Sequence, residues 1–144
     1  MRPNLLVKFL IILVGLTLLS NCTKYGTVVT GSVDNITVGL AVKPAKPTTG
    51  DNQFKVLLTD AGGPIQDAAV TVSYFMPAMG SSMPVMQGSA PAAASAPGEY
   101  VATLNLPMEG NWTITIMAGI PSKQTVRVQF RIMTGSSRLL FQGE

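Results

Sequence analysis

Alternating apolar and polar side chains constrain this chain more than any other feature of its sequence. From residue 126 to residue 132 every second side chain is apolar, and Arg127, Gln129 and Arg131 occupy the positions between them. A period of two is typical of a β-strand that buries one face, whereas an amphipathic helix repeats about every 3.6 residues. Six runs rich in β-forming residues, several with this alternation and none with a helical period, cover residues 36–42, 53–59, 69–76, 99–106, 111–118 and 125–133.

Residues that favour chain reversal separate these runs. Gly, Pro, Asp and Asn are concentrated at residues 43–44, 49–51, 60–64 and 107–111, and these residue types supply the backbone conformations that tight turns need. We therefore predict an all-β fold, an immunoglobulin-like antiparallel β-sandwich in which six or seven strands occupy about 100 residues.

The amino-terminal segment has the composition of an export signal. Arg2 and Lys8 precede an apolar run over residues 9–19. This run is shorter than the roughly 20 residues that a membrane-spanning helix needs and lies within the 7 to 15 typical of a signal peptide. The sequence LSNC at residues 19–22 resembles the lipobox of bacterial lipoproteins, in which the cysteine, here Cys22, is lipidated and becomes the first mature residue. An ordinary secretory signal and a single-pass anchor are the alternatives.

These features predict four segments and a location. The segments are a lipoprotein signal peptide (1–21), the lipidated cysteine with a flexible stalk (22–34), the β-sandwich domain with a methionine-rich loop at 76–98 (35–134), and a C-terminal tail (135–144). Lipid at Cys22 would tether the domain to a membrane outside the cytoplasm. Because Thr23 is not an aspartate, resemblance to lipoproteins generally implies the periplasmic face of the outer membrane in a two-membrane bacterium.

Missing residue types exclude several functions. The chain of 144 residues has no histidine, a single cysteine and only 12% charged residues. Without histidine it lacks the most common general base, the most common zinc ligand and the usual partner of a nucleophilic serine or cysteine. Its lysines and arginines are scattered singly, without the basic run typical of nucleic-acid binding. We therefore expect neither catalysis nor a nucleic-acid partner.

Half of the eight methionines lie between residues 76 and 86. They are Met76, Met79, Met83 and Met86, in two copies of Met-Pro-x-Met joined by Gly80-Ser81-Ser82. Proline favours an extended backbone, so that both methionines of one copy project from the same side. A chain reversal at the joining residues would then bring three or four sulfur atoms around one ion.

Thioether sulfur favours one metal in particular. It is a soft, neutral ligand that suits Cu(I), whereas zinc and Cu(II) sites usually recruit imidazole or carboxylate. Methionine has no proton to lose, so such a site would retain its metal at acidic pH. Met108 would add a sulfur if its turn lies beside the loop, and Trp112 would place an aromatic face over the ion. The pattern predicts a Cu(I) site and no other cofactor.

Other roles for these side chains stay open. Met76 continues the apolar face of the run at 69–76 and is equally compatible with core packing, as are Met108 and Trp112. Met117 and Met133 stand alone at strand ends, which favours packing or a surface position. Exposed methionines also form adaptable protein-binding surfaces, or consume oxidants through reversible sulfoxide formation.

Two longer stretches carry a resemblance to a known family. The sequence TDAGGPIQDAAVTV at 59–72 is followed by MPAMG at 76–80, and GEY at 98–100 is followed by LPMEGNWTI at 106–114. In this order they resemble the YtkA-like family, which includes FixH-type proteins, over residues 36–132. The resemblance implies an immunoglobulin-like β-sandwich outside the cytoplasm and, for some relatives, copper handling or the assembly of haem-copper oxidases. The motif residues concerned are Met76, Met79, Met83, Met86, Met108 and Trp112.

Two function hypotheses follow. In the first, a lipid-anchored extracytoplasmic protein holds or transfers Cu(I) through Met76, Met79, Met83 and Met86 without catalysis. In the second, the domain is a structural or adaptor module whose uncharged loop docks on an envelope protein, such as an efflux or oxidase-assembly component. Replacing the loop methionines by leucine separates the two, because leucine preserves apolar bulk and removes sulfur.

Overall fold

The computed structural model describes residues 24–143, and every regular element among them is a β-strand. The strands are β1 (Val29–Val33), β2 (Ile36–Lys43), β3 (Gly50–Asp60), β4 (Gly63–Pro64), β5 (Ala69–Met76), β6 (Met86–Ala96), β7 (Glu99–Leu106), β8 (Asn111–Gly119), β9 (Val126–Met133) and β10 (Leu139–Gly143). The all-β antiparallel prediction is confirmed, with ten strands instead of six or seven. The six predicted runs correspond to β2, β3, β5, β7, β8 and β9.

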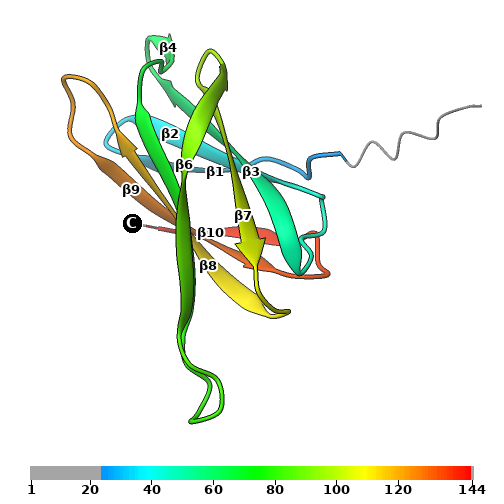
Figure 1. Cartoon of the computed structure of the whole chain (residues 1–144). Coiled ribbons are helices and arrows are strands. Elements are labelled where there is room, and N and C mark those ends of the chain that lie inside the picture. Colours follow the sequence, from blue (N-terminus) through cyan, green and yellow to red (C-terminus); the bar gives the residue numbers. More distant parts are fainter. Residues whose placement is uncertain (1–23, 144) are drawn as a thin grey trace, which may run out of the picture.

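The strands form two layers that one strand joins. Their order is β1-β2-β3-β7-β6-β5-β8-β9-β10, every pairing is antiparallel, and the short β4 pairs with β3. Residues 86–92 of β6 pair with β5 in one layer, and residues 93–96 pair with β7 in the other. Figure 1 shows β6 as the long strand that runs the height of the domain between the two layers. The sandwich is therefore continuous along this side.

The two outer strands of this order, β1 and β10, close the opposite side. The ring of Phe141 on β10 covers Gly31 on β1 so closely that a Cβ added to Gly31 would lie 2.1 Å from a ring carbon. The same ring packs edge-to-face on Phe130, with 5.6 Å between the ring centroids. The layers are thus joined by backbone pairing on one side and by aromatic packing on the other, which makes the sandwich barrel-like.

The core is built from the alternating side chains. In β9 the four apolar positions predicted to face inward are buried, while Arg127 and Arg131 are exposed. The largest fully buried side chains come from both layers: Trp112, Phe54, Phe130, Leu40, Leu58, Leu106, Ile114, Ile116 and Ile132. Burial of such side chains contributes about 1.5–3 kcal/mol each, which lets the domain fold without a disulfide.

The segment predicted as a flexible stalk, residues 22–34, differs from that expectation where it is described. Tyr25 lies on the outer face of the first layer, with the Nζ atom of Lys55 4.5 Å from its ring centroid. Its hydroxyl donates to the Gln53 side chain at 3.2 Å, and the N–H of Gly26 donates to the Val42 carbonyl at 2.8 Å. Residues 29–33 then form β1. The aromatic ring and the two hydrogen bonds dock this segment; Cys22 and the predicted signal peptide lie outside the described residues.

The predicted loop at 76–98 and the predicted tail at 135–144 also contain strands. β6 is rich in Gly, Ala, Ser and Pro, which have low strand propensity. Pairing with β5 and then β7 nevertheless supplies its backbone hydrogen bonds, and Gly88 makes room for the ring of Tyr74, 2.7 Å from the position of an added Cβ. In the C-terminal segment, the packing of Phe141 holds β10 in place.

Among residues 24–143 no helix is long and apolar enough to cross a membrane.

Candidate functional site: the methionine hairpin

Strands β5 and β6 form a hairpin whose connection carries the methionine repeat. We call residues 76–86 the methionine hairpin. Its outermost residues are closed by a hydrogen bond from the N–H of Met79 to the carbonyl of Met83, 3.0 Å long, and Gly80 has a positive φ of 76°. The reversal expected at Gly80-Ser81-Ser82 is therefore present. Figure 1 shows this loop projecting beyond the other connections at the bottom of the view.

The four repeat methionines divide into two pairs. Met79 and Met83, at the tip, are 50% and 41% exposed. Met76 and Met86, at the base, are opposite each other in the β5–β6 ladder, where Met76 is buried and Met86 half-buried. Each Met-Pro-x-Met copy thus supplies one residue to the tip and one to the base. In the first copy the two methionines differ in burial because Met76 is the last residue of β5 and its side chain belongs to the core.

The base of the hairpin packs against the turn between β7 and β8. The methyl carbon of Met76 lies 2.7 Å from the position of an added Cβ on Gly110, whose φ is +146°. The indole N–H of Trp112 donates to the carbonyl of Met108 at 3.3 Å, and its buried ring packs edge-to-face on Tyr74 with centroids 5.3 Å apart. Met108 is half-buried against the core. These contacts are those of core packing for Met76 and Trp112.

The side chains at the tip of the hairpin are of the kind that binds a soft metal ion, and the surrounding segment carries no charge. Residues 68–98 contain no charged side chain and no histidine or cysteine, so sulfur is the strongest soft ligand there. The hydrogen bond between Met79 and Met83 keeps the two residues adjacent, and each thioether stands on three rotatable bonds. Met86, the next methionine along the chain, is half-buried. Elsewhere in residues 24–143 no three His, Cys, Asp or Glu side chains gather as a metal site would require.

The perturbed carboxyl of the domain lies away from this hairpin. A hydrogen bond from the Lys123 ammonium, with Nζ 2.5 Å from Oδ2, lowers the pKa of Asp60, and the N–H of Gly62 donates to its other oxygen at 2.8 Å. Lys123 belongs to the β8–β9 connection, at the end of the sandwich opposite the hairpin. The interaction stabilises a turn and does not involve the methionine hairpin.

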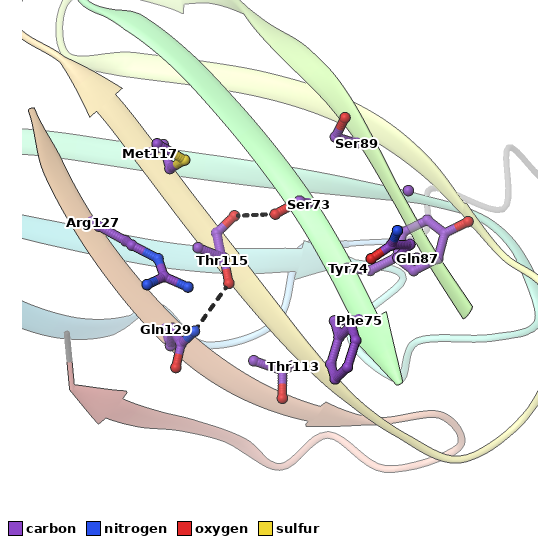
Figure 2. A pocket seen from close by; sticks show the side chains of 11 residues that line it. Ser73, Tyr74, Phe75, Gln87, Ser89, Thr113, Thr115, Met117, Arg127 and Gln129 are labelled. Atoms are coloured by element: carbon purple, nitrogen blue, oxygen red, sulfur yellow. Dashed lines mark hydrogen bonds between the residues drawn. The ribbon is translucent and has the colours of Figure 1, made fainter. Parts of the chain in front are cut away.

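Sequence reasoning did not single out a second surface, the outer face of the second layer. An open groove of about 900 Å³ lies there, and Figure 2 shows the side chains that line it. Its lining is made of hydroxyl and amide side chains, one guanidinium, two aromatic rings and one thioether: Ser73, Tyr74, Phe75, Gln87, Gly88, Ser89, Thr113, Thr115, Met117, Arg127 and Gln129. Ser73 donates to the Thr115 carbonyl and Gln129 to the Thr115 hydroxyl. The polar positions of the alternating strands are the sequence signal for this face.

Comparisons with known proteins agree with the fold. The sequence pattern of the YtkA-like family matches residues 31–117. The structure is similar to the crystal structure of a DUF4426 family protein from Pseudomonas aeruginosa, with a TM-score of 0.53 and 16% identity over 81% of this chain and 99% of that one. At this identity the likeness concerns the fold alone. No curated protein matches the sequence.

Proposed function

The chain belongs to the YtkA-like family, and from this premise we propose that it is a lipid-anchored extracytoplasmic protein that holds or passes Cu(I) through its methionine hairpin. The observation that carries the proposal is the tip: two solvent-exposed thioethers, Met79 and Met83, on residues joined by a backbone hydrogen bond. Soft neutral sulfur in a segment without imidazole or carboxylate, residues 68–98, favours Cu(I) over zinc and Cu(II).

The geometry narrows the ligand set. Met79 and Met83 supply two sulfur atoms, and Met86 supplies a third from the half-buried base. Met76 contributes to the core instead, because its side chain is 2% exposed and lies against Gly110. Two or three thioethers on a solvent-accessible tip suit a carrier, since an accepting protein can approach the ion directly.

A Cu(I) titration of the full chain in detergent micelles tests this function. We compare the wild type with the double variant Met79→Leu, Met83→Leu, using a competing chromophoric ligand under anaerobic reducing conditions. The matched control is Met117→Leu, Met133→Leu, which removes two thioethers of similar exposure (46% and 42%) outside the hairpin. We expect one high-affinity Cu(I) per chain in the wild type and in the control, and its loss in the hairpin variant. Unchanged binding in all three would contradict the proposal.

The adaptor function is the second candidate, and the exposure of Val85 favours it. This side chain is 49% exposed beside Met83, on a tip that projects from the domain. An uncharged apolar projection of this kind fits a pocket on another envelope protein. Because leucine preserves apolar bulk, an adaptor would keep its partner in the Met79→Leu, Met83→Leu variant, whereas a copper carrier would lose its metal.

A further inference from the structure

The end of the sandwich that carries the methionine hairpin is also the end at which the described chain begins. β1 begins where β2 ends, since Val29 pairs with Leu40, and β5 ends beside the start of β8, since Phe75 pairs with Thr113. We call this end the N-terminal rim. It comprises residues 24–28 and the connections at 44–49, 77–85, 107–110 and 134–138. In Figure 1 the first described residues (blue) lie at the right, the hairpin at the bottom, and the other connections between them.

Direct contacts link the parts of this rim. Gly26 lies against Ala45, with 3.3 Å between an added Cβ and the Ala45 Cα atom. The N–H of Gly135 donates to the Pro47 carbonyl at 2.7 Å, and the N–H of Thr134 donates to the Gly110 carbonyl at 3.1 Å. Gly110 in turn contacts Met76 at the base of the hairpin. The rim is therefore one continuous surface.

The described chain begins at this rim, at Lys24. Tyr25 is docked beside Lys43 and Lys55. Only two residues of the sequence separate Tyr25 from Cys22. A lipid at Cys22, on which the proposed function also rests, would therefore tether the domain by its N-terminal rim.

Charge is distributed to suit such an approach. The basic side chains of the N-terminal rim are Lys24, Lys46 and Arg138, against the single acid Glu109. At the opposite end of the described chain the acids Asp34, Asp60 and Asp67 outnumber the single Lys123. Basic residues are attracted to anionic headgroups within a Debye length, and the acidic end is then held away from them.

We propose that the N-terminal rim rests on an anionic lipid bilayer and that the tip of the methionine hairpin contacts the bilayer interface through Met79, Met83 and Val85. Each of these side chains is at least 41% exposed, and the sequence from residue 68 to residue 98 carries no charge that would oppose entry into the interface. The inference shares with the proposed function only the amino-terminal tether, and it needs no copper.

Tryptophan fluorescence of the full chain in vesicles tests this orientation. The natural Trp112 is fully buried and provides a constant background. We introduce one further tryptophan by Val85→Trp at the hairpin tip, or by Gln66→Trp at the opposite end as the positional control. Each chain is reconstituted into phosphatidylglycerol–phosphatidylcholine vesicles, isolated by flotation, and compared with and without lipids brominated on their acyl chains.

For Val85→Trp we expect brominated lipids to quench the emission about twofold beyond the wild-type background, and for Gln66→Trp no excess quenching. Reversing the rim charge with Lys46→Glu, Arg138→Glu reduces the excess quenching, whereas Arg127→Glu, on the outer face of the second layer, does not. The Met79→Leu, Met83→Leu change in the Val85→Trp chain keeps the quenching, so that loss of copper binding and loss of membrane contact are separable.

Three results would overturn the inference. The first is a floated Val85→Trp chain that is quenched no more than the wild type, which would leave the tip free for a protein partner. The second is equal quenching of the Gln66→Trp chain, which would mean that the domain has no fixed orientation. The third is quenching that is indifferent to reversal of the rim charges, which would remove the anionic bilayer from the proposal.

Discussion

The backbone N–H of Met79 donates a hydrogen bond to the carbonyl of Met83, and this single contact closes the tip of the methionine hairpin. It makes the two Met-Pro-x-Met copies approach each other at their inner ends. Below it, Met76 and Met86 are ladder partners whose side chains turn toward the sandwich. A repeat that is symmetric in sequence thereby separates into two exposed sulfur atoms at the tip and two packed methionines at the base.

Trp112 is predicted to be the most costly single truncation near the hairpin base. Its ring is fully buried, packs on Tyr74, and bonds to the Met108 carbonyl. Trp112→Ala leaves a large cavity and should lower the free energy of unfolding by about 3–5 kcal/mol. Urea unfolding followed by circular dichroism measures this, with the exposed Met133→Leu as the control of little effect. A Trp112→Ala loss below that of the control would show that the ring does not support the core.

Substitutions at Gly31 and Phe141 are predicted to have non-additive effects on the free energy of unfolding. Gly31→Ala pushes the ring away from β1 and should destabilise the domain by about 1–3 kcal/mol, because the added methyl group overpacks a filled site. With Phe141→Ala already present, the same change should cost much less, since no ring opposes it. A double-mutant cycle from urea midpoints measures the coupling. Equal costs in the two backgrounds would mean that the strands β1 and β10 do not close the sandwich in solution.

The ion pair between Asp60 and Lys123 should make the stability of the fold depend on pH in a defined direction. The hydrogen bond from Lys123, together with that from Gly62, lowers the carboxyl pKa of Asp60 in the folded state. Its contribution to stability is therefore present above the unfolded-state pKa and is lost as pH falls through the lower, folded-state pKa. Lys123→Ala should raise the pKa of Asp60 toward its ordinary value, as measured by NMR titration of the carboxyl carbon. Lys46→Ala, at the other rim, should leave that titration unchanged.

How far the sequence predicts the fold depends on where each strand obtains its stability. β5, β7 and β9 were predictable because their own alternating side chains bury one face, a signal contained within eight residues of each. β6 carries no such signal. Its small residues become a strand because β5 and β7 offer hydrogen bonds on either side and because the ring of Tyr74 needs the space at Gly88.

β1 and β10 depend on a contact between the two ends of the domain. Gly31 and Phe141 are unremarkable as single residues, and only the closed sandwich brings the ring onto the glycine. The docking of Tyr25 on Lys55 is similarly non-local. A local reading of sequence assigns such segments to stalk or tail, because their stability comes from partners far away in the chain.

The sequence predicts which residues cluster at the candidate site, but not how the four methionines are arranged there. Clustering of methionine without histidine pointed to Cu(I) chemistry from sequence alone. The separation into an exposed pair and a packed pair depends on β5 continuing through Met76, which the proline at residue 77 then ends by removing a backbone donor. The position of the tip on the same rim as the amino-terminal segment follows only from the strand order.

X-ray absorption spectroscopy at the copper edge, on the full chain loaded with one equivalent of Cu(I), tests the central claim most directly. We predict two or three sulfur atoms bonded to copper in the wild type and in the Met117→Leu, Met133→Leu control. The Met79→Leu, Met83→Leu chain should lose this signal or retain no copper. Cys22 is present in all three chains and cannot produce the difference. Copper bound only through oxygen or nitrogen in the wild type, or an unchanged sulfur signal in the hairpin variant, would contradict the assignment of the methionine hairpin as a Cu(I) carrier.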